Sequence, residues 1–230
     1  MDNTLSTQIN DFNNFQDSCN YFDIELKNNQ LDLFKKYYEI LLDWNKKINL
    51  ISRKEQNILE KHFLDSILFL PEIEGIARKG VEHSAPTDGF DIGSGGGFPA
   101  IPLVIMRPEW KFTLCESTSK KANFLISLVK ELELETRIII VNNRVEAVHK
   151  LSSHKNKYNF VTARAITKLD ELIKYSMPLL KKDGCLLAYK GKSVGDEMKI
   201  AEKKYKLPIK IFRKEISGIE RNLVMVQKIT

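Results

Sequence analysis

Apolar residues recur every three or four positions in the first third of the chain and gather into short runs farther along. The three- and four-residue spacing predicts an amphipathic helix over residues 31–47, and residues 55–73 repeat the pattern to an end near Pro71. Glycine and proline then cluster between Gly75 and Gly89, where we expect a boundary. The first 30 residues are polar, which predicts a weakly structured arm or a short helix.

From Phe90 onward, short apolar runs alternate with segments of helical period. Because such alternation specifies a parallel sheet with helices on both faces, we expect a doubly wound, Rossmann-like α/β fold with an antiparallel C-terminal edge and an N-terminal helical cap. The expected divisions are an arm (1–30), the cap (31–85) and the sheet domain (86–230). Strands are expected at 89–92, 111–115, 137–141, 159–162, 185–189, 209–216 and 222–228, and helices at 99–106, 119–132, 169–180 and 196–205.

Three glycines, Gly93, Gly95 and Gly97, follow directly after the first of these strands. Glycine allows positive φ and lets backbone N–H groups approach a ligand at a helix N-terminus. Dinucleotide-binding proteins use a similar loop, but Phe98 stands where their fingerprint has its third small residue. Asp91 would repel a pyrophosphate, whereas its charge suits the cationic α-amino group of S-adenosylmethionine.

Glu116 ends the second expected strand, where its carboxylate can accept hydrogen bonds from both hydroxyls of a ribose. Ligands of doubly wound sheets bind at the carboxyl ends of the strands, which is where both acids and the glycines fall. The combination favours S-adenosylmethionine as cofactor over a glycine-rich turn that binds nothing.

The segment after the fourth strand limits which kinds of acceptor atom the protein is expected to methylate. Enzymes that methylate exocyclic amines usually carry Asn/Asp-Pro-Pro-aromatic there, but residues 162–165 are Thr-Ala-Arg-Ala, and no cysteine follows a proline as in many pyrimidine-C5 enzymes. An acceptor with a free lone pair remains favoured. Guanine N7 is such an atom, and its methylation needs placement and desolvation but no general base.

With these motifs in place, the chain resembles the bacterial 16S rRNA guanine-N7 methyltransferases, a family also called glucose-inhibited division protein B or small-subunit rRNA methyltransferase G. The resemblance covers roughly residues 30–230 and leaves the arm unmatched. It implies methyl transfer from S-adenosylmethionine to a guanine of the 530 loop, in free 16S rRNA or a small-subunit particle. The matching segments are 44–50 (Trp-Asn-Lys-Lys-Ile-Asn-Leu), 61–66 (Lys-His-Phe-Leu-Asp-Ser), 91–103, 143–146, 162–165 and 190–191.

Two residues, Arg164 and Lys190, are the catalytic candidates, and both are expected to act by positioning. Arg164 is expected to hold the cofactor carboxylate or an RNA phosphate, with a structural salt bridge as the alternative, and Lys190 to contact a phosphate. Phe98 packs either on the methionine part of the cofactor or in the core, and His62 is expected in the core or a cofactor lid. The expected cofactor contacts are Asp91, Gly93, Gly95, Gly97, Phe98, Glu116, Ser117, Thr118, Val145, Glu146 and Arg164, and no metal is expected.

Charge is distributed unevenly along the chain. The first 30 residues hold one lysine and five acids, so of the net charge of +6 the remaining residues carry +10. A basic excess favours a polyanionic partner, although a solvated lysine-rich surface would give the same count. The three cysteines are far apart, which fits a reducing cytoplasm, and we expect a monomer without membrane contact. A small-molecule or protein methyltransferase and a non-catalytic RNA-binding assembly factor remain the alternatives.

Overall fold

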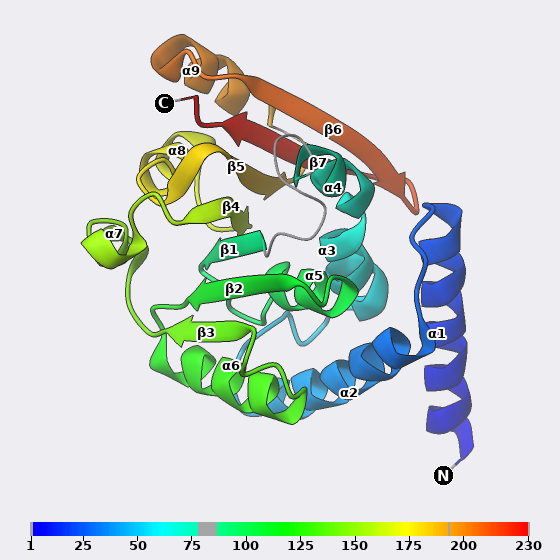
Figure 1. Cartoon of the computed structure of the whole chain (residues 1–230). Coiled ribbons are helices and arrows are strands. Elements are labelled where there is room, and N and C mark those ends of the chain that lie inside the picture. Colours follow the sequence, from blue (N-terminus) through cyan, green and yellow to red (C-terminus); the bar gives the residue numbers. More distant parts are fainter. Residues whose placement is uncertain (1, 78–86, 193, 230) are drawn as a thin grey trace.

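The computed structural model describes residues 2–77, 87–192 and 194–229 of the chain. Its centre is a seven-stranded sheet in the order β3-β2-β1-β4-β5-β7-β6 (Figure 1). β7 is antiparallel to both neighbours and the remaining pairs are parallel, so the α/β fold class with an antiparallel C-terminal edge is confirmed. The strands are β1 (Thr87–Ile92), β2 (Trp110–Cys115), β3 (Ile138–Val141), β4 (Tyr158–Arg164), β5 (Leu180–Lys190), β6 (Ile209–Ile216) and β7 (Ile219–Gln227).

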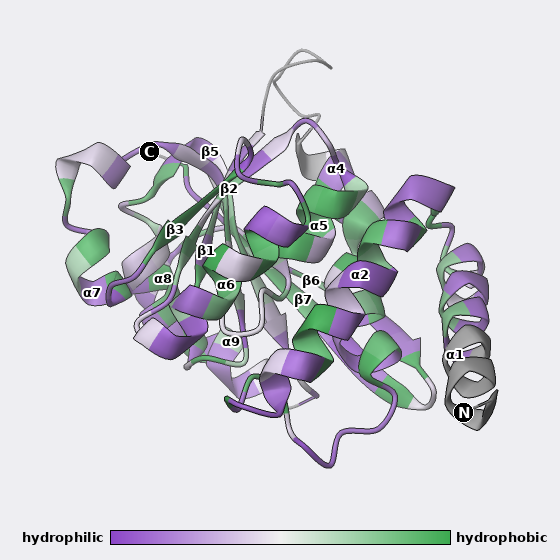
Figure 2. Ribbon diagram, turned by 90° about the horizontal axis from the view of Figure 1, so that it is seen from below, coloured by the Kyte–Doolittle hydropathy of each residue, from purple (hydrophilic) through white to green (hydrophobic). Residues whose placement is uncertain are grey.

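Helices cover both faces of the sheet. One buried apolar cluster joins the sheet to the cap helices, α5 and α6, and a second joins it to α7, α8 and α9. Figure 2 shows the hydrophobic colour on the central strands and the hydrophilic colour on the outer turns of the helices. No described helix is long and apolar enough to cross a membrane. The helices are α1 (Asp2–Tyr21), α2 (Asn28–Asn45), the π-helix η1 (Leu59–Leu64), α3 (Asp65–Ile67), α4 (Leu70–Ala77), α5 (Ala100–Met106), α6 (Ser119–Glu131), α7 (Val145–Val148), the 3-10 helix η2 (Ser152–His154), α8 (Leu169–Ser176) and α9 (Gly195–Tyr205).

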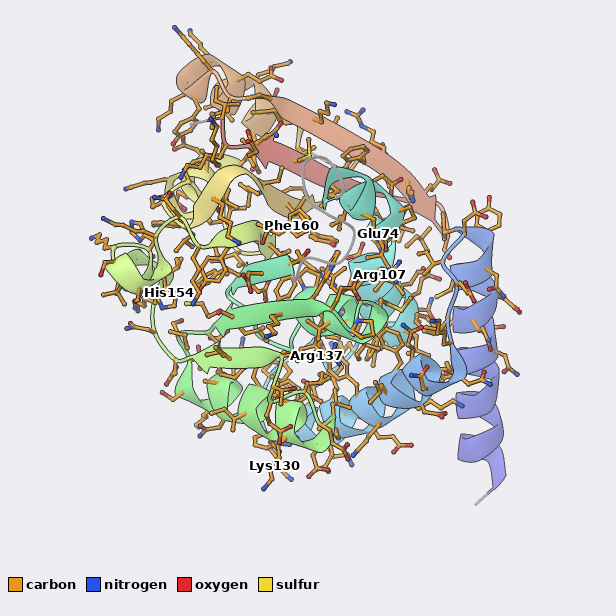
Figure 3. The ribbon with its side chains drawn as sticks, viewed as in Figure 1. Glu74, Arg107, Lys130, Arg137, His154 and Phe160 are labelled. Atoms are coloured by element: carbon orange, nitrogen blue, oxygen red, sulfur yellow. The ribbon has the colours of Figure 1, made fainter. Side chains whose placement is uncertain are left out.

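The cap is joined to the sheet domain at α5. The buried Gln30 side chain donates to the carbonyl oxygens of Ile105 and Met106, at 3.2 and 3.1 Å. Arg107, directly after α5, forms an ion pair with Glu74 of α4 (Figure 3). Because these bonds satisfy polar groups at the end of a buried helix, they fix the cap relative to the glycine-rich segment that precedes α5.

The N-terminal segment is more ordered than the polar composition suggests. α1 is a 20-residue helix that stands at the outer side of the cap (Figure 1). Phe12, Phe15 and Cys19 are buried, and the Phe15 ring packs edge-on against Phe34 of α2. Their three- and four-residue spacing is the helical signal that the surrounding Asn and Asp residues obscure.

The helix expected over residues 55–73 is divided. Its first part is the π-helix η1, followed by α3, and α4 then begins at Leu70. The expectation that this helix ends near Pro71 is therefore wrong: Pro71 lies in the first turn of α4, where a missing N–H costs nothing because that donor has no helical partner. The expected boundary between Gly75 and Gly89 lies mainly on residues 78–86, outside the described part.

A second difference concerns the end of α8. The helix stops at Ser176 rather than near Leu180, and β5 begins at Leu180. Pro178 follows the helical C-cap residue Met177 and, because proline has no backbone N–H, it cannot continue the helical hydrogen bonding. The extra length of β5 pairs irregularly with β4, with a register shift between Tyr158 and Phe160.

Candidate functional site

The glycine loop, residues 93–97, joins β1 to α5 in a conformation that glycine alone adopts without strain. Gly93, Gly95 and Gly97 have φ of +66°, +51° and +92°. The N–H groups of Gly93 and Ser94 donate to the carbonyl of Cys115 at the end of β2, at 2.8 and 3.2 Å. A Cβ at Gly97 would come within 2.6 Å of the Tyr37 hydroxyl, whereas at Gly95 the nearest neighbour is Gly93 O at 3.8 Å. Gly95 is thus the position at which the loop backbone is open to a ligand.

Glu116 closes one side of the glycine loop. Its Oε2 accepts a hydrogen bond from Gly95 N at 2.9 Å, and Oε1 accepts one from Thr118 N at 2.7 Å. The register of β1 with β2, in which Ile92 lies opposite Cys115, brings the two segments together. Each carboxylate oxygen keeps a further lone pair, so the side chain is fixed and can still accept from the hydroxyls of a ribose.

Asp91 lies fully buried beneath the same loop. Its Oδ1 accepts a hydrogen bond from the Thr162 hydroxyl at 2.6 Å, and Oδ2 has no hydrogen-bond partner among the described residues. Burial raises the pKa of Asp91 to about 7 and the nearby charge of Glu116 adds to the shift, although the hydroxyls of Ser94 and Thr162 and the charge of Arg164 act against it. A buried carboxylate with a free oxygen fits an ammonium group, as S-adenosylmethionine would supply.

The remaining expected cofactor residues follow the next strands along the sheet. Ser117, Thr118 and Glu146 are exposed, and Val145 begins α7 directly after the β3 loop. Asn142, which sequence reasoning missed, donates to the carbonyl of Glu116 at 2.8 Å and so links the ends of β2 and β3. These residues border the glycine loop side of the sheet, and their contacts with a cofactor remain predictions.

Phe98 packs in the core between the loop and the cap. Its ring stacks on Tyr37 of α2, with centroids 5.3 Å apart, and meets the ring of Phe63 edge-on at 5.1 Å. The Tyr37 hydroxyl donates to the carbonyl of Gly96. The core alternative therefore describes Phe98 in this structure, and its aromatic neighbours hold the glycine loop against the cap.

Arg164, the last residue of β4, contacts the cap. Its guanidinium donates to the carbonyls of Lys61 and His62 at 3.1 and 3.3 Å and to His62 Nδ1 at 2.6 Å. It also pairs with Asp65 at 3.4 Å and lies 5.5 Å from the ring centroid of Phe98. The salt-bridge alternative is present in this structure, while a role for Arg164 toward cofactor or RNA stays a prediction.

The π-helix makes this contact possible. A π-helix pairs residue i with residue i+5 rather than i+4, which displaces backbone carbonyls from the regular α-helical pairing, and such segments are frequent at functional sites. In η1 the carbonyls of Lys61 and His62 turn to Arg164. Asp65 follows η1 directly and bridges Arg164 to Arg221 of β7, with Arg221 Nε at 3.2 Å from Asp65 Oδ1.

A cavity of about 340 Å³, which we call the strand-end cavity, lies where the cap meets the ends of β4, β5 and the β6–β7 turn. Four cationic side chains and two carboxylates line it, which leaves a net positive wall. Sequence reasoning did not assign Asp65, Arg221 or Asn222 to any site. The charged lining residues are Lys61, Arg164, Lys190, Arg221, Glu55 and Asp65.

Lys190 is held within this wall. Its Nζ donates to the carbonyl of Thr167 at 2.6 Å and to Glu197 Oε2 at 2.8 Å, and its side chain is 13% exposed. Two of the three N–H groups of the ammonium are thus used inside the protein. A phosphate contact would use the third, so that role also stays a prediction.

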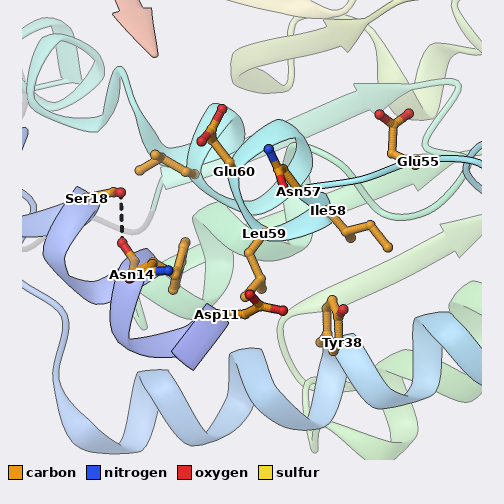
Figure 4. Close-up of a pocket in the computed structure, with 11 residues that line it drawn as sticks. Asp11, Asn14, Ser18, Tyr38, Glu55, Asn57, Ile58, Leu59 and Glu60 are labelled. Atoms are coloured by element: carbon orange, nitrogen blue, oxygen red, sulfur yellow. Dashed lines mark hydrogen bonds between the residues drawn. The ribbon is translucent and has the colours of Figure 1, made fainter. Parts of the chain in front are cut away.

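A second cavity, of about 310 Å³, lies between α1, α2 and the η1 segment (Figure 4). Asp11, Glu55 and Glu60 contribute carboxylates to its wall, and Ser18 donates to the carbonyl of Asn14 at 2.8 Å. Acidic walls repel a polyanion. The strand-end cavity has the opposite charge, and its lining residue Arg164 acts electrostatically on Asp91, so this cavity is the candidate for an RNA nucleotide.

Comparisons with known proteins find relatives that align along most of the chain. The family model for rRNA small subunit methyltransferase G matches residues 30–224. The ribosomal RNA small subunit methyltransferase G of Lactococcus lactis subsp. lactis (strain IL1403) is 36% identical over 220 residues, covering 93% of this chain and 89% of that protein. The protein of the same name from Desulforamulus reducens is 35% identical over 214 residues, covering 90% and 85%.

Solved structures support the fold. The N-terminal domain of human METTL16 in complex with SAH aligns with a TM-score of 0.60 at 13% identity, over 85% of this chain and 82% of that one. An O-methyltransferase from Bacillus cereus in complex with SAH aligns with a TM-score of 0.60 at 12% identity, over 84% and 90%. From the match of the family model and the extent of these relatives, the chain belongs to the rRNA small subunit methyltransferase G family.

Proposed function

We propose that this chain transfers the methyl group of S-adenosylmethionine to N7 of a guanine in the 530 loop of 16S rRNA, acting as a monomer in the cytoplasm. One observation carries the proposal: a buried acid lies beneath an open glycine loop, and a cavity with a cationic wall includes Arg164, whose charge acts on that acid. The first feature suits a cationic cofactor and the second a polyanionic acceptor. Family membership supplies the RNA class.

The residues present fit S-adenosylmethionine. Asp91 Oδ2 would take its ammonium group, the free lone pairs of Glu116 its ribose hydroxyls, and the open backbone at Gly95 would lie against it. When bound, the cofactor supplies an electrophilic methyl on a sulfonium. Val145 and Glu146, after β3, are the proposed contacts for the adenine, with Ser117 and Thr118 beside the ribose.

The protein's part in the transfer is placement. Guanine N7 has no proton to lose, so no side chain has to act as a base. The positive wall of the strand-end cavity would hold the flanking phosphates, with Arg164 and Lys190 as proposed positioning residues. Burial and the charge of Arg164 lower the pKa of His62 to about 4, so this histidine is neutral and adds no positive charge near a ring that becomes cationic.

Mass spectrometry of nucleosides from 16S rRNA tests the proposal. In cells that lack this gene, 7-methylguanosine at the target position should be absent, and the purified protein with S-adenosylmethionine should restore it on small subunits from those cells. Retention of the modification in the deletion strain, together with no transfer in vitro, would contradict the assignment. An Asp91→Asn variant, which keeps the shape of the side chain and loses its charge, serves as the inactive control.

A further inference from the structure

Besides Arg221 Nε, which is ion-paired with Asp65 at 3.2 Å, two polar atoms of residues that line the strand-end cavity lack hydrogen-bond partners. His62 Nε2 and Asn222 Oδ1 are buried and have no hydrogen-bond partner within the described part of the chain, and both residues line the cavity. An unpaired buried polar atom is costly, and most such atoms in native proteins find a partner. A ligand that offers one hydrogen-bond acceptor and one donor in the right places would satisfy both unpaired atoms.

The proton on His62 can be assigned from its neighbour. His62 Nδ1 lies 2.6 Å from Nη2 of Arg164, and a guanidinium only donates, so Nδ1 is the acceptor. The neutral ring therefore carries its proton on Nε2. Glu55 Oε2 lies 4.0 Å from Nε2, beyond hydrogen-bond range, and Glu55 Oε1 pairs with Lys61 at 2.5 Å. His62 thus presents an N–H donor.

Asn222 presents the opposite group. Its Nδ2 donates to the carbonyl of Gly191 at 3.1 Å and to Glu220 Oε1 at 2.9 Å. Because both partners are acceptors, they determine which end of the amide is the nitrogen, and Oδ1 is left as the free acceptor. Asn222 lies opposite Lys190 in the β5–β7 register, at the end of the sheet where the target would enter.

We propose that His62 Nε2–H and Asn222 Oδ1 together recognise the Watson–Crick edge of the target guanine. O6 would accept from His62, and N1–H would donate to Asn222, which leaves N7 free for the methyl group. Adenine presents an amino donor in place of O6 and an acceptor at N1, so both contacts would be lost and two donors would face each other. The inference rests on the proposed function and adds a basis for choosing guanine over adenine.

Base analogues test this without altering the protein. Small subunits would be reconstituted with a 16S rRNA that carries 2-aminopurine riboside at the methylated position, which retains N7 and the 2-amino group but lacks O6 and N1–H. Dimethyl sulfate reactivity of the two bases corrects for any difference between their N7 atoms. We expect wild-type methylation of the analogue to be slower than that of guanosine by at least about tenfold, because buried partners are left unpaired.

Two variants then assign the loss to the named residues. His62→Phe keeps an aromatic ring and Asn222→Leu keeps a similar size, and each removes the hydrogen-bonding group. Each should slow guanosine methylation by about tenfold or more yet change the rate on 2-aminopurine by less than about twofold, because the contact is already missing there. Gln227→Leu, on β7 away from the cavity, is the matched control and should leave both rates unchanged. Cofactor affinity, measured by calorimetry, checks that each variant is folded.

The outcomes separate the two proposals. Equal wild-type rates on guanosine and 2-aminopurine would overturn base recognition by this cavity, as would variants that lose the same factor on both substrates. Either result leaves guanine N7 methylation in place. Failure of the proposed function would appear instead as no methyl at N7 of the natural substrate with the wild-type protein.

Discussion

The glycine loop and the strand-end cavity lie at the same end of the sheet, but they are built in different ways. The loop is local: Asp91 and the glycines are adjacent in sequence, Glu116 is one strand away, and the hydrogen bonds that shape the loop come mainly from the backbone. The cavity is assembled from distant segments. Asp65 of the cap joins Arg164 of β4 to Arg221 of β7 through ion pairs between side chains.

This difference predicts that the two regions respond differently to substitution. A change in the loop alters backbone conformation and should affect cofactor binding alone. A change in the cavity disturbs a network of charges and should affect the position of the target. Arg164 connects the two regions: it lines the strand-end cavity and contacts the cap, and it lies over the ring of Phe98, which packs beneath the glycine loop.

The largest effect is expected for Gly95→Val. At φ +51° a β-branched residue is strained by about 1–3 kcal/mol, and its side chain would occupy the open space at the loop. Cofactor affinity should fall below detection in calorimetry while the circular dichroism spectrum stays native. Unchanged affinity in a folded variant would refute the cofactor site.

Arg164→Ala should lower turnover by on the order of a hundredfold through misplacement of cap and target. The variant removes the bonds to Lys61, His62 and Asp65 together. Single-turnover kinetics with saturating cofactor separates this loss from weaker binding. Full activity in this variant would show that the cap contact has no part in the reaction.

The pH dependence of cofactor affinity tests Asp91. Its pKa in the ligand-free protein is raised from 3.8 to about 7, so the folded state binds the proton more tightly than the unfolded chain, and this contribution to stability is lost as pH rises from about 4 through 7. The ammonium of the cofactor needs the charged carboxylate. Cofactor affinity should therefore increase as the pH is raised towards about 7, by up to about tenfold per pH unit, and level off above it. Asp91→Asn should remove this slope, and a slope that persisted in that variant would belong to another group.

The smallest effect is expected for Lys190→Ala. Glu197 and the Thr167 carbonyl already hold the ammonium, so RNA affinity should fall only a few-fold, with the salt slope reduced by about 1 and cofactor affinity unchanged. Filter binding at several salt concentrations gives the slope. If the slope stayed at the wild-type value, Lys190 would have a structural role alone.

The contrast between the regions also explains what the sequence could predict. The strands, the glycine loop and its two acids follow from local patterns, so their places at the strand ends could be inferred from spacing. Asp65, Arg221 and Asn222 carry no local signal, because their role depends on how the cap and the β6–β7 hairpin come together. The same holds for Pro71, where the propensity to end a helix and the propensity to begin one look alike without the tertiary contacts of α4.

Replacement of the target guanosine by 7-deazaguanosine in reconstituted small subunits tests the central claim most directly. The analogue keeps O6, N1–H and the 2-amino group and lacks the lone pair at position 7. The protein should bind this substrate as it binds the natural one, and methyl transfer from radiolabelled S-adenosylmethionine should stop. Transfer to the analogue at the normal rate would show that another atom accepts the methyl group and would contradict the account.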